Sequence, residues 1–399
     1  MEDNNVIILK GRIDSNNADE WERKIFDQLG TTETTGAVFD ASELSYISSA
    51  GLRVLMKVRK TLNRKITVLN VSRDVFDIFD VTGFTQLFDV RKPLREISVD
   101  GCEEIGAGAY GHVYRIDPET IAKIYNPGLP LDFVEKERRT AQSVFLLGVP
   151  TAISYDVVKC GESFGVVYEL LDAKTTAQLI LEDRSRVVEI GENCGKFLKQ
   201  MHKIRVPEEI GLPSAKQNIL EAVKVFGKFI TDEEAEKINA LIMNIPDRNT
   251  FIHGDFNSRN IMVKDGEFQL IDIGDAAYGH PLCDFAVIML SYVYLPSIAE
   301  HLTKDFLKKV LVIEPEDAKL LWNTICRTYF GFSEQKEIDT LTEKLMPFMH
   351  LILSTHSMRF AKDEAGKKAS IDRTIRGQLI PEIDSMKSFA FLEEYFGDE

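Results

Sequence analysis

Two patterns of hydrophobic and polar positions follow one another along this chain. In the first 92 residues, short apolar segments alternate with longer segments in which apolar residues recur at helical spacing. Short apolar runs between turn residues are typical of buried strands, and the helical spacing is typical of amphipathic helices. The pattern predicts strands at 6–13, 37–40 and 66–71 and helices at 15–29, 50–62 and 73–81. This alternation indicates an α/β domain over residues 1–92.

The rest of the chain has strands first and helices afterwards. Strand-like segments occur at 95–105, 112–116 and 121–124, and a helix is expected after Pro130. Farther on, helix-period apolar runs occur at 306–312, 318–330, 338–353 and 386–395. We therefore expect a helical subdomain packed on a catalytic core.

The segment from His253 to Asp272 carries the strongest chemical signal. Asp255 is followed five residues later by Asn260 on a loop, and Asp272 ends an apolar strand. This order suits phosphoryl transfer. Asp255 would take the proton of the attacking hydroxyl, while Asn260 and Asp272 would hold Mg²⁺ across nucleotide phosphates. His253 is expected to brace the loop. The alternative is that these are turn residues and a strand cap.

A glycine-rich segment lies upstream of this loop. Gly106, Gly108 and Gly111 stand between strand-like segments, and not between a strand and a helix. This placement predicts a hairpin that covers phosphates, because the glycine turn of a dinucleotide-binding fold opens a helix instead.

Lys123 lies in a short apolar strand, where a lysine requires a partner or a ligand. We expect it to contact the nucleotide phosphates. The helix after Pro130 supplies Glu137 as its partner, and Glu135 is the competing choice. The alternative is an edge-strand lysine that points into solvent.

Residues from about 96 to 399 resemble the aminoglycoside phosphotransferase and choline kinase family. The resemblance rests on spaced motifs that occur in the family's order: Met201-His202, His253-Gly-Asp255, Asn260, Ile271-Asp272, Gly279-His-Pro281 and Asp284. It implies an α+β, two-lobed, protein-kinase-like fold, with an antiparallel-sheet N-lobe at 96–172 and a mostly helical C-lobe at 173–399. It also implies ATP and Mg²⁺ as cofactors, with Glu169 and Leu171 at the adenine-binding hinge.

Two departures from related patterns bear on the substrate. Arg259 stands where many relatives carry glycine, and Asp272 is followed by Ile-Gly where protein kinases have Phe-Gly. Neither change removes an oxygen ligand. No Ala-Pro-Glu segment follows Asp272, which argues against a peptide-docking activation segment. The expected acceptor is therefore a hydroxyl of a small molecule, of amino alcohol, aminoglycoside or sugar type.

The N-terminal residues resemble the STAS domain of bacterial anti-sigma factor antagonists. The resemblance is carried by residues 40–52 and 79–88. It implies an α/β STAS domain at 1–92, a phosphorylatable serine at Ser49 and an anti-sigma-type partner protein. The family's usual Asp just before that serine is Ser48 here. A helix N-terminus favours a phosphate, but either serine could equally serve only as the helix cap.

Composition limits the partners and the compartment. Among 399 residues the net charge is −15, and residues 1–95 carry equal numbers of acidic and basic side chains, so the rest holds the whole excess. Nucleic acid is thus an unexpected partner. The five cysteines are scattered without CxxC spacing, and the longest apolar run, 285–295, is too short to span a bilayer. We expect a cytoplasmic protein that does not bind membranes.

Three functional hypotheses remain open from the sequence. The first is a small-molecule kinase regulated by its STAS domain. The second is an anti-sigma factor antagonist-type signalling protein whose kinase-like part senses nucleotide. In the third, the kinase-like part phosphorylates Ser49. Trp322, Tyr329, Phe330 and Phe332 could line a pocket for a quaternary ammonium group or could simply be core residues.

Overall fold

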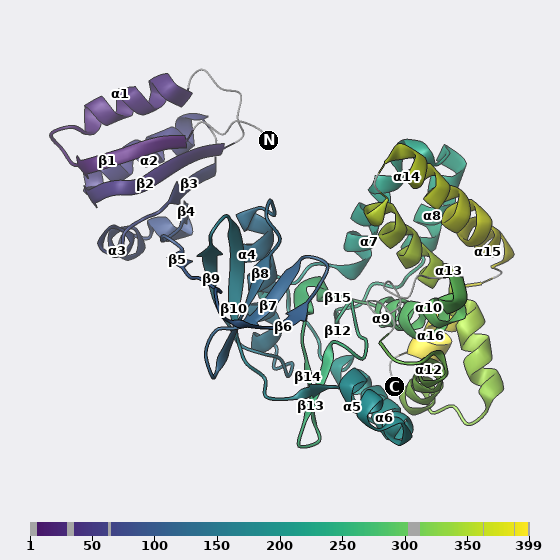
Figure 1. The fold of residues 1–399 in the computed structure, drawn as a ribbon. Helices are drawn as coiled ribbons and strands as arrows, with labels where there is room; N and C mark the ends of the chain where they lie inside the picture. The colour runs from purple at the N-terminus through teal and green to yellow at the C-terminus, as the bar shows by residue number, and fades with distance from the viewer. Residues whose placement is uncertain are drawn as a thin grey trace. The chain divides into compact units, whose positions relative to one another are not determined.

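The computed structural model describes residues 6–29, 36–62, 65–301, 312–361, 363–386 and 388–397. The chain divides into two compact units, residues 1–98 with 157–162, and residues 99–156 with 163–399 (Figure 1). Each unit has its own hydrophobic core.

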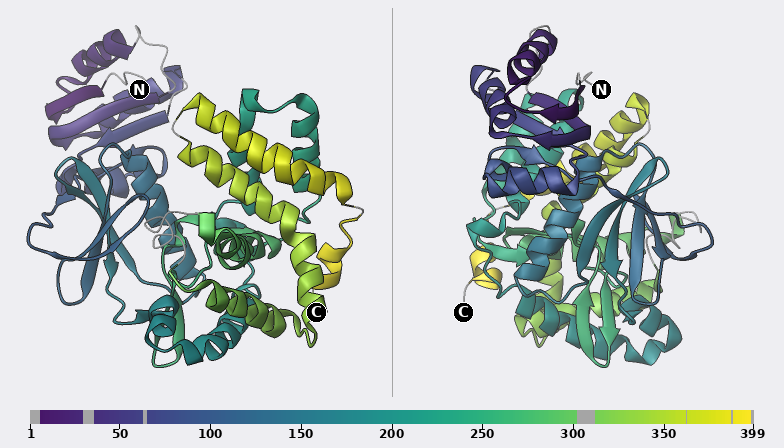
Figure 2. Two further views of the ribbon diagram at one scale, coloured as in Figure 1. Left: turned by 45° about the vertical axis from the view of Figure 1, so that its right-hand side comes forward. Right: turned by 90° about the vertical axis from the view of Figure 1, so that its left-hand side faces the viewer.

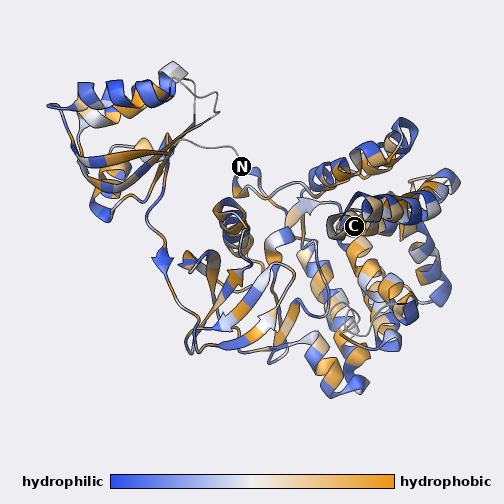
Figure 3. Ribbon diagram, turned by 45° about the horizontal axis from the view of Figure 1, so that its top comes forward, coloured by the Kyte–Doolittle hydropathy of each residue, from blue (hydrophilic) through white to orange (hydrophobic). Residues whose placement is uncertain are grey.

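The first unit contains a four-stranded parallel sheet in the order β1-β2-β3-β4. Its strands are β1 (Val6–Ile13), β2 (Gly36–Ile47), β3 (Lys65–Leu69) and β4 (Asp89–Val90). Parallel strands need crossover connections, and three helices provide them: α1 (Ala18–Leu29), α2 (Ser49–Leu62) and α3 (Arg73–Val81). Figure 3 shows apolar residues along these strands, whereas α1 is apolar along one side only.

The core of this unit explains the pattern read from the sequence. Alternate residues of β1 are buried, including Ile7 and Leu9, and they pack with Ile25 of α1 and Val58 of α2. The predicted elements are present, but β2 is longer than expected. It continues to Ile47, because the register shifts between β1 and β2 let the pairing run past the polar residues after position 40.

The N-lobe is built on a mainly antiparallel sheet in the order β5-β9-β10-β8-β7-β6. Its strands are β5 (Arg95–Glu96), β6 (Glu103–Ala107), β7 (Gly111–Arg115), β8 (Thr120–Tyr125), β9 (Ser154–Cys160) and β10 (Ser163–Glu169). The first predicted strand, 95–105, is therefore two short strands separated by a turn. Helix α4 (Leu131–Leu146) follows Pro130 as expected and buries Val134, Ala141 and Val144.

The C-lobe is mostly helical. Its helices are α5 (Thr176–Glu182), α6 (Val187–Met201), α7 (Ala215–Val223), α8 (Asp232–Met243), α9 (Leu282–Met289), α10 (Leu295–Ser297), α12 (Pro315–Phe330), α13 (Gln335–Phe360), α14 (Glu364–Ile371), α15 (Ile380–Ser385) and α16 (Phe391–Phe396). Its short strands are β11 (Lys174–Thr175), β12 (Thr250–Ile252), β13 (Ile261–Lys264), β14 (Glu267–Leu270) and β15 (Ala277–Gly279). In the left view of Figure 2, α13 to α15 lie beside α7 and α8.

The predicted helical runs at 318–330 and 338–353 correspond to α12 and α13, and the run at 386–395 contains the short α16. Most of the run predicted at 306–312 lies outside the described residues. The apolar run at 285–295 starts in α9 and continues as a π-helical segment, Leu290–Tyr294. Among the described residues, no helix is both long and apolar enough to cross a membrane.

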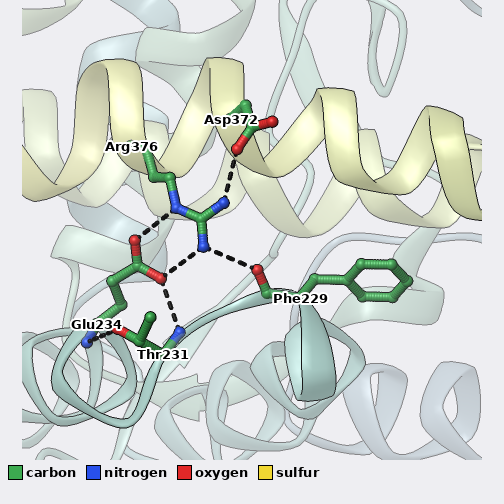
Figure 4. A network of polar contacts seen from close by, with 5 residues as sticks. All are labelled: Phe229, Thr231, Glu234, Asp372 and Arg376. Atoms are coloured by element: carbon green, nitrogen blue, oxygen red, sulfur yellow. Dashed lines mark hydrogen bonds and ion pairs between the residues drawn. The ribbon is translucent and has the colours of Figure 1, made fainter.

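An arginine joins separate helices of the C-lobe (Figure 4). Arg376 lies in the π-helical segment Asp372–Leu379, and its Nε and Nη2 donate to Glu234 of α8 at 2.7 and 3.0 Å. Its Nη1 and Nη2 also donate to Asp372 at 2.6 Å and to the Phe229 carbonyl at 3.0 Å. This bidentate geometry fixes the distance between two segments far apart in sequence.

Candidate active site

The loop after β12 begins with a glycine that no other residue can replace easily. Gly254 has φ +82°, and a Cβ there would lie 2.6 Å from the Asp275 carbonyl oxygen. The left-handed backbone and the close approach both require the absence of a side chain. This tight turn delivers Asp255, the predicted base, to the end of β12.

Asp284, at the start of α9, binds the backbone of this turn. Its carboxylate is 1% exposed and accepts hydrogen bonds from the backbone N–H groups of His253 at 3.1 Å and Gly254 at 2.7 Å. It also lies 3.0 Å from Nε2 of His202, whose Nδ1 lies 2.8 Å from the Tyr329 hydroxyl. Burial by itself raises the pKa of Asp284, but the bond from His202 and the backbone donors lower it. The buried carboxylate is therefore ionised and anchors the loop to the C-lobe.

His253 braces the loop through both ring nitrogens. Its Nδ1 accepts the N–H of Asp255 at 3.1 Å, so the proton of a neutral ring lies on Nε2. The Nε2 then donates to the Ile271 carbonyl at 3.3 Å. Both nitrogens are thus bonded within the protein, and only 1% of the residue is exposed, so His253 braces the loop.

The carboxylate of Asp255 is held by two amides. Its Oδ1 accepts from Nδ2 of Asn257 at 2.8 Å, and its Oδ2 accepts from Nδ2 of Asn260 at 2.7 Å. Burial raises the pKa of Asp255 to about 6. The nearby His253 lowers this pKa in part, and the Asp272 carboxylate raises it further. A carboxylate with such a pKa suits a proton acceptor near neutral pH.

The side-chain orientation of Asn260 follows from its partners. Its Nδ2 also donates to the Asp255 backbone carbonyl at 2.9 Å, and a carbonyl can only accept. The amide NH₂ therefore points at Asp255, and the Asn260 Oδ1 points to the other side. Because its backbone carbonyl accepts the N–H of Ile271 at 2.9 Å, the residue is also tied to the segment that carries Asp272.

Asp272 occupies a backbone conformation that is rare for residues with a side chain. Its φ and ψ are 54° and 52°, which turns the chain sharply after β14 into the short 3₁₀ helix Ile273–Asp275. Its Oδ1 lies 2.8 Å from Nζ of Lys123. Burial alone raises the pKa of Asp272, but the Lys123 ammonium lowers it below the usual value. Such strained residues are common at functional sites.

Lys123 lies between two carboxylates. In the centre of β8, its Nζ contacts Oε1 of Glu137 at 2.7 Å and Asp272 at 2.8 Å. Burial alone lowers the pKa of Lys123, yet the two carboxylates raise it above its usual value. Glu135, the competing choice in the sequence, instead lies 3.8 Å from Arg139 on the same helix. The lysine thus joins the N-lobe sheet, α4 and the end of β14.

The three predicted glycines lie in the β6–β7 hairpin but differ in their surroundings. At Gly106 and Gly108 a Cβ would find its nearest neighbours at 3.7 and 3.9 Å, so the fold itself leaves room there. At Gly111 a Cβ would overlap the Ile124 carbonyl and lie 2.9 Å from Cα of Tyr125. Gly111 is therefore required by the close approach of β8, whereas Gly106 and Gly108 are not required by packing.

The predicted hinge lies at the end of β10. The Glu169 side chain turns back, and its Oε2 accepts the N–H of Ile153 at 3.3 Å. The N–H of Leu170 donates to the Glu119 carbonyl at 2.8 Å, which fixes the chain between the two predicted hinge residues. The Leu171 carbonyl accepts from Ala173 at 2.9 Å.

A family model described as "Phosphotransferase enzyme family" matches residues 101–308, just over half of the chain. The chain belongs to this phosphotransferase family. A STAS domain model matches residues 2–97. A relative named as an anti-sigma factor antagonist, BtrV of Bordetella bronchiseptica, is 33% identical over 88 residues, which are 21% of this chain and 75% of the relative. These matches and the sheet topologies confirm the predicted fold class and both resemblances.

Solved structures similar to the phosphotransferase include the streptomycin–ATP ternary complex of APH(2'')-IIa. It is 16% identical, with a TM-score of 0.45, over 77% of this chain and 98% of that one. A choline/ethanolamine kinase family protein from Mesorhizobium loti is 13% identical, with a TM-score of 0.44, over 74% of this chain and 92% of that one.

In the STAS domain of this phosphotransferase, the roles of the two adjacent serines are separated. Ser48 Oγ accepts the N–H groups of Ala50 at 3.2 Å and Gly51 at 3.5 Å, so Ser48 caps α2. Ser49 is exposed, and its Oγ lies 3.5 Å from Nη2 of Arg53. The cap that the sequence allowed at either serine is therefore Ser48, and Ser49, the predicted phosphorylation candidate, is not the cap.

Two parts of the phosphotransferase site were underestimated from the sequence. Asp284 was recognised only as a family motif, and Asn257 was not singled out, because the sequence does not show which loop residues turn inward. Conversely, the aromatic residues considered for a cation pocket pack together: Phe285 lies 4.8 Å from Tyr329 and 4.9 Å from Phe330 between ring centroids. These residues belong to the core of the C-lobe.

Proposed function

We propose that this phosphotransferase transfers the γ-phosphoryl group of ATP, with Mg²⁺, to a hydroxyl group of a small molecule. The observation that carries the proposal is that Lys123 connects the predicted nucleotide-binding residues of the N-lobe with the predicted metal ligand Asp272 of the C-lobe. It contacts Glu137 on the N-lobe side and Asp272 on the C-lobe side, at 2.7 and 2.8 Å. Phosphoryl transfer depends mainly on positioning and on neutralising charge, and this arrangement serves both.

The donor set fits Mg²⁺. Asn260 turns its NH₂ to Asp255, so its carbonyl oxygen faces away from the base, and the Asp272 side chain is 52% exposed with one oxygen on Lys123. Among the described residues no cluster of three His, Cys, Asp or Glu side chains could hold a metal. A pair of oxygen ligands completed by nucleotide phosphates is the arrangement that Mg²⁺ usually takes. When bound there, Mg²⁺ would neutralise charge on those phosphates.

The nucleotide would use groups that the fold leaves accessible. The absence of side chains at Gly106 and Gly108 would let phosphates approach the backbone of this hairpin, in which the Gly108 N–H donates to the Gly111 carbonyl at 2.8 Å, and Lys123 supplies a charge. Among the backbone bonds of the described residues, none uses the Leu171 N–H, which suits an adenine edge, and the preceding Glu169 would present its carbonyl. Glu137 would keep Lys123 in place when phosphates replace Asp272 as its partner.

A small acceptor is supported by the short segment between Asp272 and α9. After the 3₁₀ turn, β15 pairs directly with β12, and α9 begins at Leu282. This leaves no extended segment on which a peptide could dock in the manner of protein kinases. Asp255 would accept the hydroxyl proton as the acceptor oxygen attacks the γ-phosphorus.

A screen tests this function. ATP consumption should be measured with amino alcohols, aminoglycosides and sugars for the wild type, Asp255→Ala, Asp272→Ala and the control Asp232→Ala. Asp232 is exposed in the first turn of α8. We expect acceptor-dependent turnover by the wild type and the control only. Wild-type turnover by Asp255→Ala would overturn the mechanism, and silence across the panel would overturn the small-molecule acceptor.

A second function is supported by the exposed Ser49. A phosphate there would lie at the N-terminus of α2, whose dipole favours an anion, and beside the Arg53 guanidinium, whose Nη2 is 3.5 Å from the hydroxyl. The phosphotransferase would then act on the STAS domain of its own chain or of a neighbouring copy. Incubation with labelled ATP and peptide mapping should place label on Ser49 without added acceptor. Label that persists in Ser49→Ala would contradict this function.

A further inference from the structure

Asn257 lies two residues after Asp255, between the base and Asn260. It is 5% exposed, although asparagines of loops are usually at the surface. Its Nδ2 donates to Oδ1 of Asp255 at 2.8 Å and to the Asp255 carbonyl at 3.2 Å. Its Oδ1 accepts the N–H of Arg259 at 3.0 Å. The side chain is therefore buried and has partners on both sides of its amide.

These partners determine the orientation of the amide. The backbone N–H of Arg259 can only donate, so the carbonyl oxygen of Asn257 must face it. The NH₂ group must then face Asp255. The amide orientation of Asn257 therefore follows from its hydrogen-bond partners, which resolve the usual ambiguity between the nitrogen and oxygen of an asparagine side chain.

The two asparagines differ in what else they do. Asn260 holds Oδ2 of Asp255 through its NH₂ group and turns its carbonyl oxygen, the expected cation ligand, away from Asp255. Asn257 uses its carbonyl on the loop backbone and its NH₂ only on Asp255. A hydrogen bond to a carboxylate is stronger than one between neutral groups, and here it fixes the rotation of the carboxylate plane. Two donors on opposite oxygens leave Asp255 one orientation.

We propose that Asn257 is a positioning residue that orients the Asp255 carboxylate for the acceptor hydroxyl. The inference rests on the proposed function. In that reaction the acceptor oxygen bonds to the γ-phosphorus as the bond to the ADP oxygen breaks, and the hydroxyl proton passes to Asp255. A base turned away from the hydroxyl would accept that proton poorly, while nucleotide binding would be unchanged.

The first test uses Asn257→Asp. This change keeps the size of the side chain and an oxygen for the Arg259 N–H, but it replaces the donor that faces Asp255 with an acceptor. We expect kcat to fall by about ten- to hundredfold, the effect of losing a hydrogen bond to a charged group. The KM for ATP should stay near wild type, whereas the melting temperature should fall, because the side chain that replaces the amide brings a second carboxylate against Asp255. Asn218→Asp, an exposed position of α7, is the matched control and should keep wild-type kcat.

The second test separates positioning from a general structural role. In the Asp255→Ala background, Asn257→Asp and Asn257→Ala should leave the residual rate unchanged within about twofold, because a residue that acts only through Asp255 has nothing left to orient. A further fall in that rate, or wild-type kcat in both single variants, would overturn the proposal. A wild type without any transfer activity would instead overturn the proposed function.

Discussion

Nζ of Lys123 lies 2.8 Å from Oδ1 of Asp272, although 149 residues separate them in the chain. The lysine also contacts Glu137 at 2.7 Å and is largely buried, with 17% of its side chain exposed. Lys123→Met should leave two carboxylates without their cation and remove a charge from the nucleotide phosphates. We expect kcat/KM for ATP to fall by about a hundredfold or more.

Nucleotide titration and steady-state kinetics check this expectation. The control is Lys224→Met, since Lys224 is 68% exposed and pairs with neighbouring Glu221 on the helical surface. Exposed pairs of this kind contribute little to stability. Unchanged nucleotide affinity in Lys123→Met would contradict the role of this lysine.

Activity should fall at low pH, because Asp255 must be ionised to accept a proton. Burial raises the pKa of Asp255 from 3.8 to about 6. Below about pH 6, kcat/KM should fall about tenfold per pH unit. The raised pKa also changes how the free energy of unfolding depends on pH. Protonated Asp255 favours the folded state at low pH, and this stabilisation is lost as pH rises from 3.8 to 6, which is the opposite of a salt-bridged carboxylate. A flat rate profile between pH 5 and 7 would be incompatible with Asp255 as the base.

Asp284 should contribute more to stability than an ordinary carboxylate does. Asp284→Ala would leave the N–H groups of His253 and Gly254 without their acceptor inside the C-lobe. We expect a loss of about 3 kcal/mol in the free energy of unfolding, measured by urea denaturation, and a larger loss of activity. Asp284→Asn retains one acceptor oxygen, so its free energy of unfolding should lie between those of Asp284→Ala and the wild type. Equal stability of Asp284→Ala and wild type would refute the anchoring role.

The two ends of the glycine-rich hairpin should respond differently to alanine. Gly111→Ala places a Cβ against the Ile124 carbonyl, so we expect destabilisation of about 2 kcal/mol or more by thermal or urea unfolding. Gly108→Ala meets no atom closer than 3.9 Å and should keep its stability while weakening ATP binding. The opposite pattern would show that Gly111 is the phosphate contact and Gly108 the structural glycine.

The candidate site could be found largely from local spacing. The interval from Asp255 to Asn260, the following Asp272 and the lone lysine in an apolar strand each have a short-range physical reason. Helical and strand periods likewise revealed the α/β domain and the helical C-lobe. Strand ends were less predictable. The sequence did not reveal that β2 continues past position 40, because pairing with β1 and its bulges decides that length.

What the sequence determined by itself was therefore the set of candidate site residues and the order of elements, since both follow from residue type and periodicity. Only the tertiary structure decided which groups meet. It placed Glu137 and not Glu135 beside Lys123. It made Ser48 the cap of α2 and left Ser49 exposed. It also turned the Asn257 side chain inward onto Asp255. These outcomes depend on the packing of distant segments and on the directions of side chains around a turn, which are set by the folded chain as a whole.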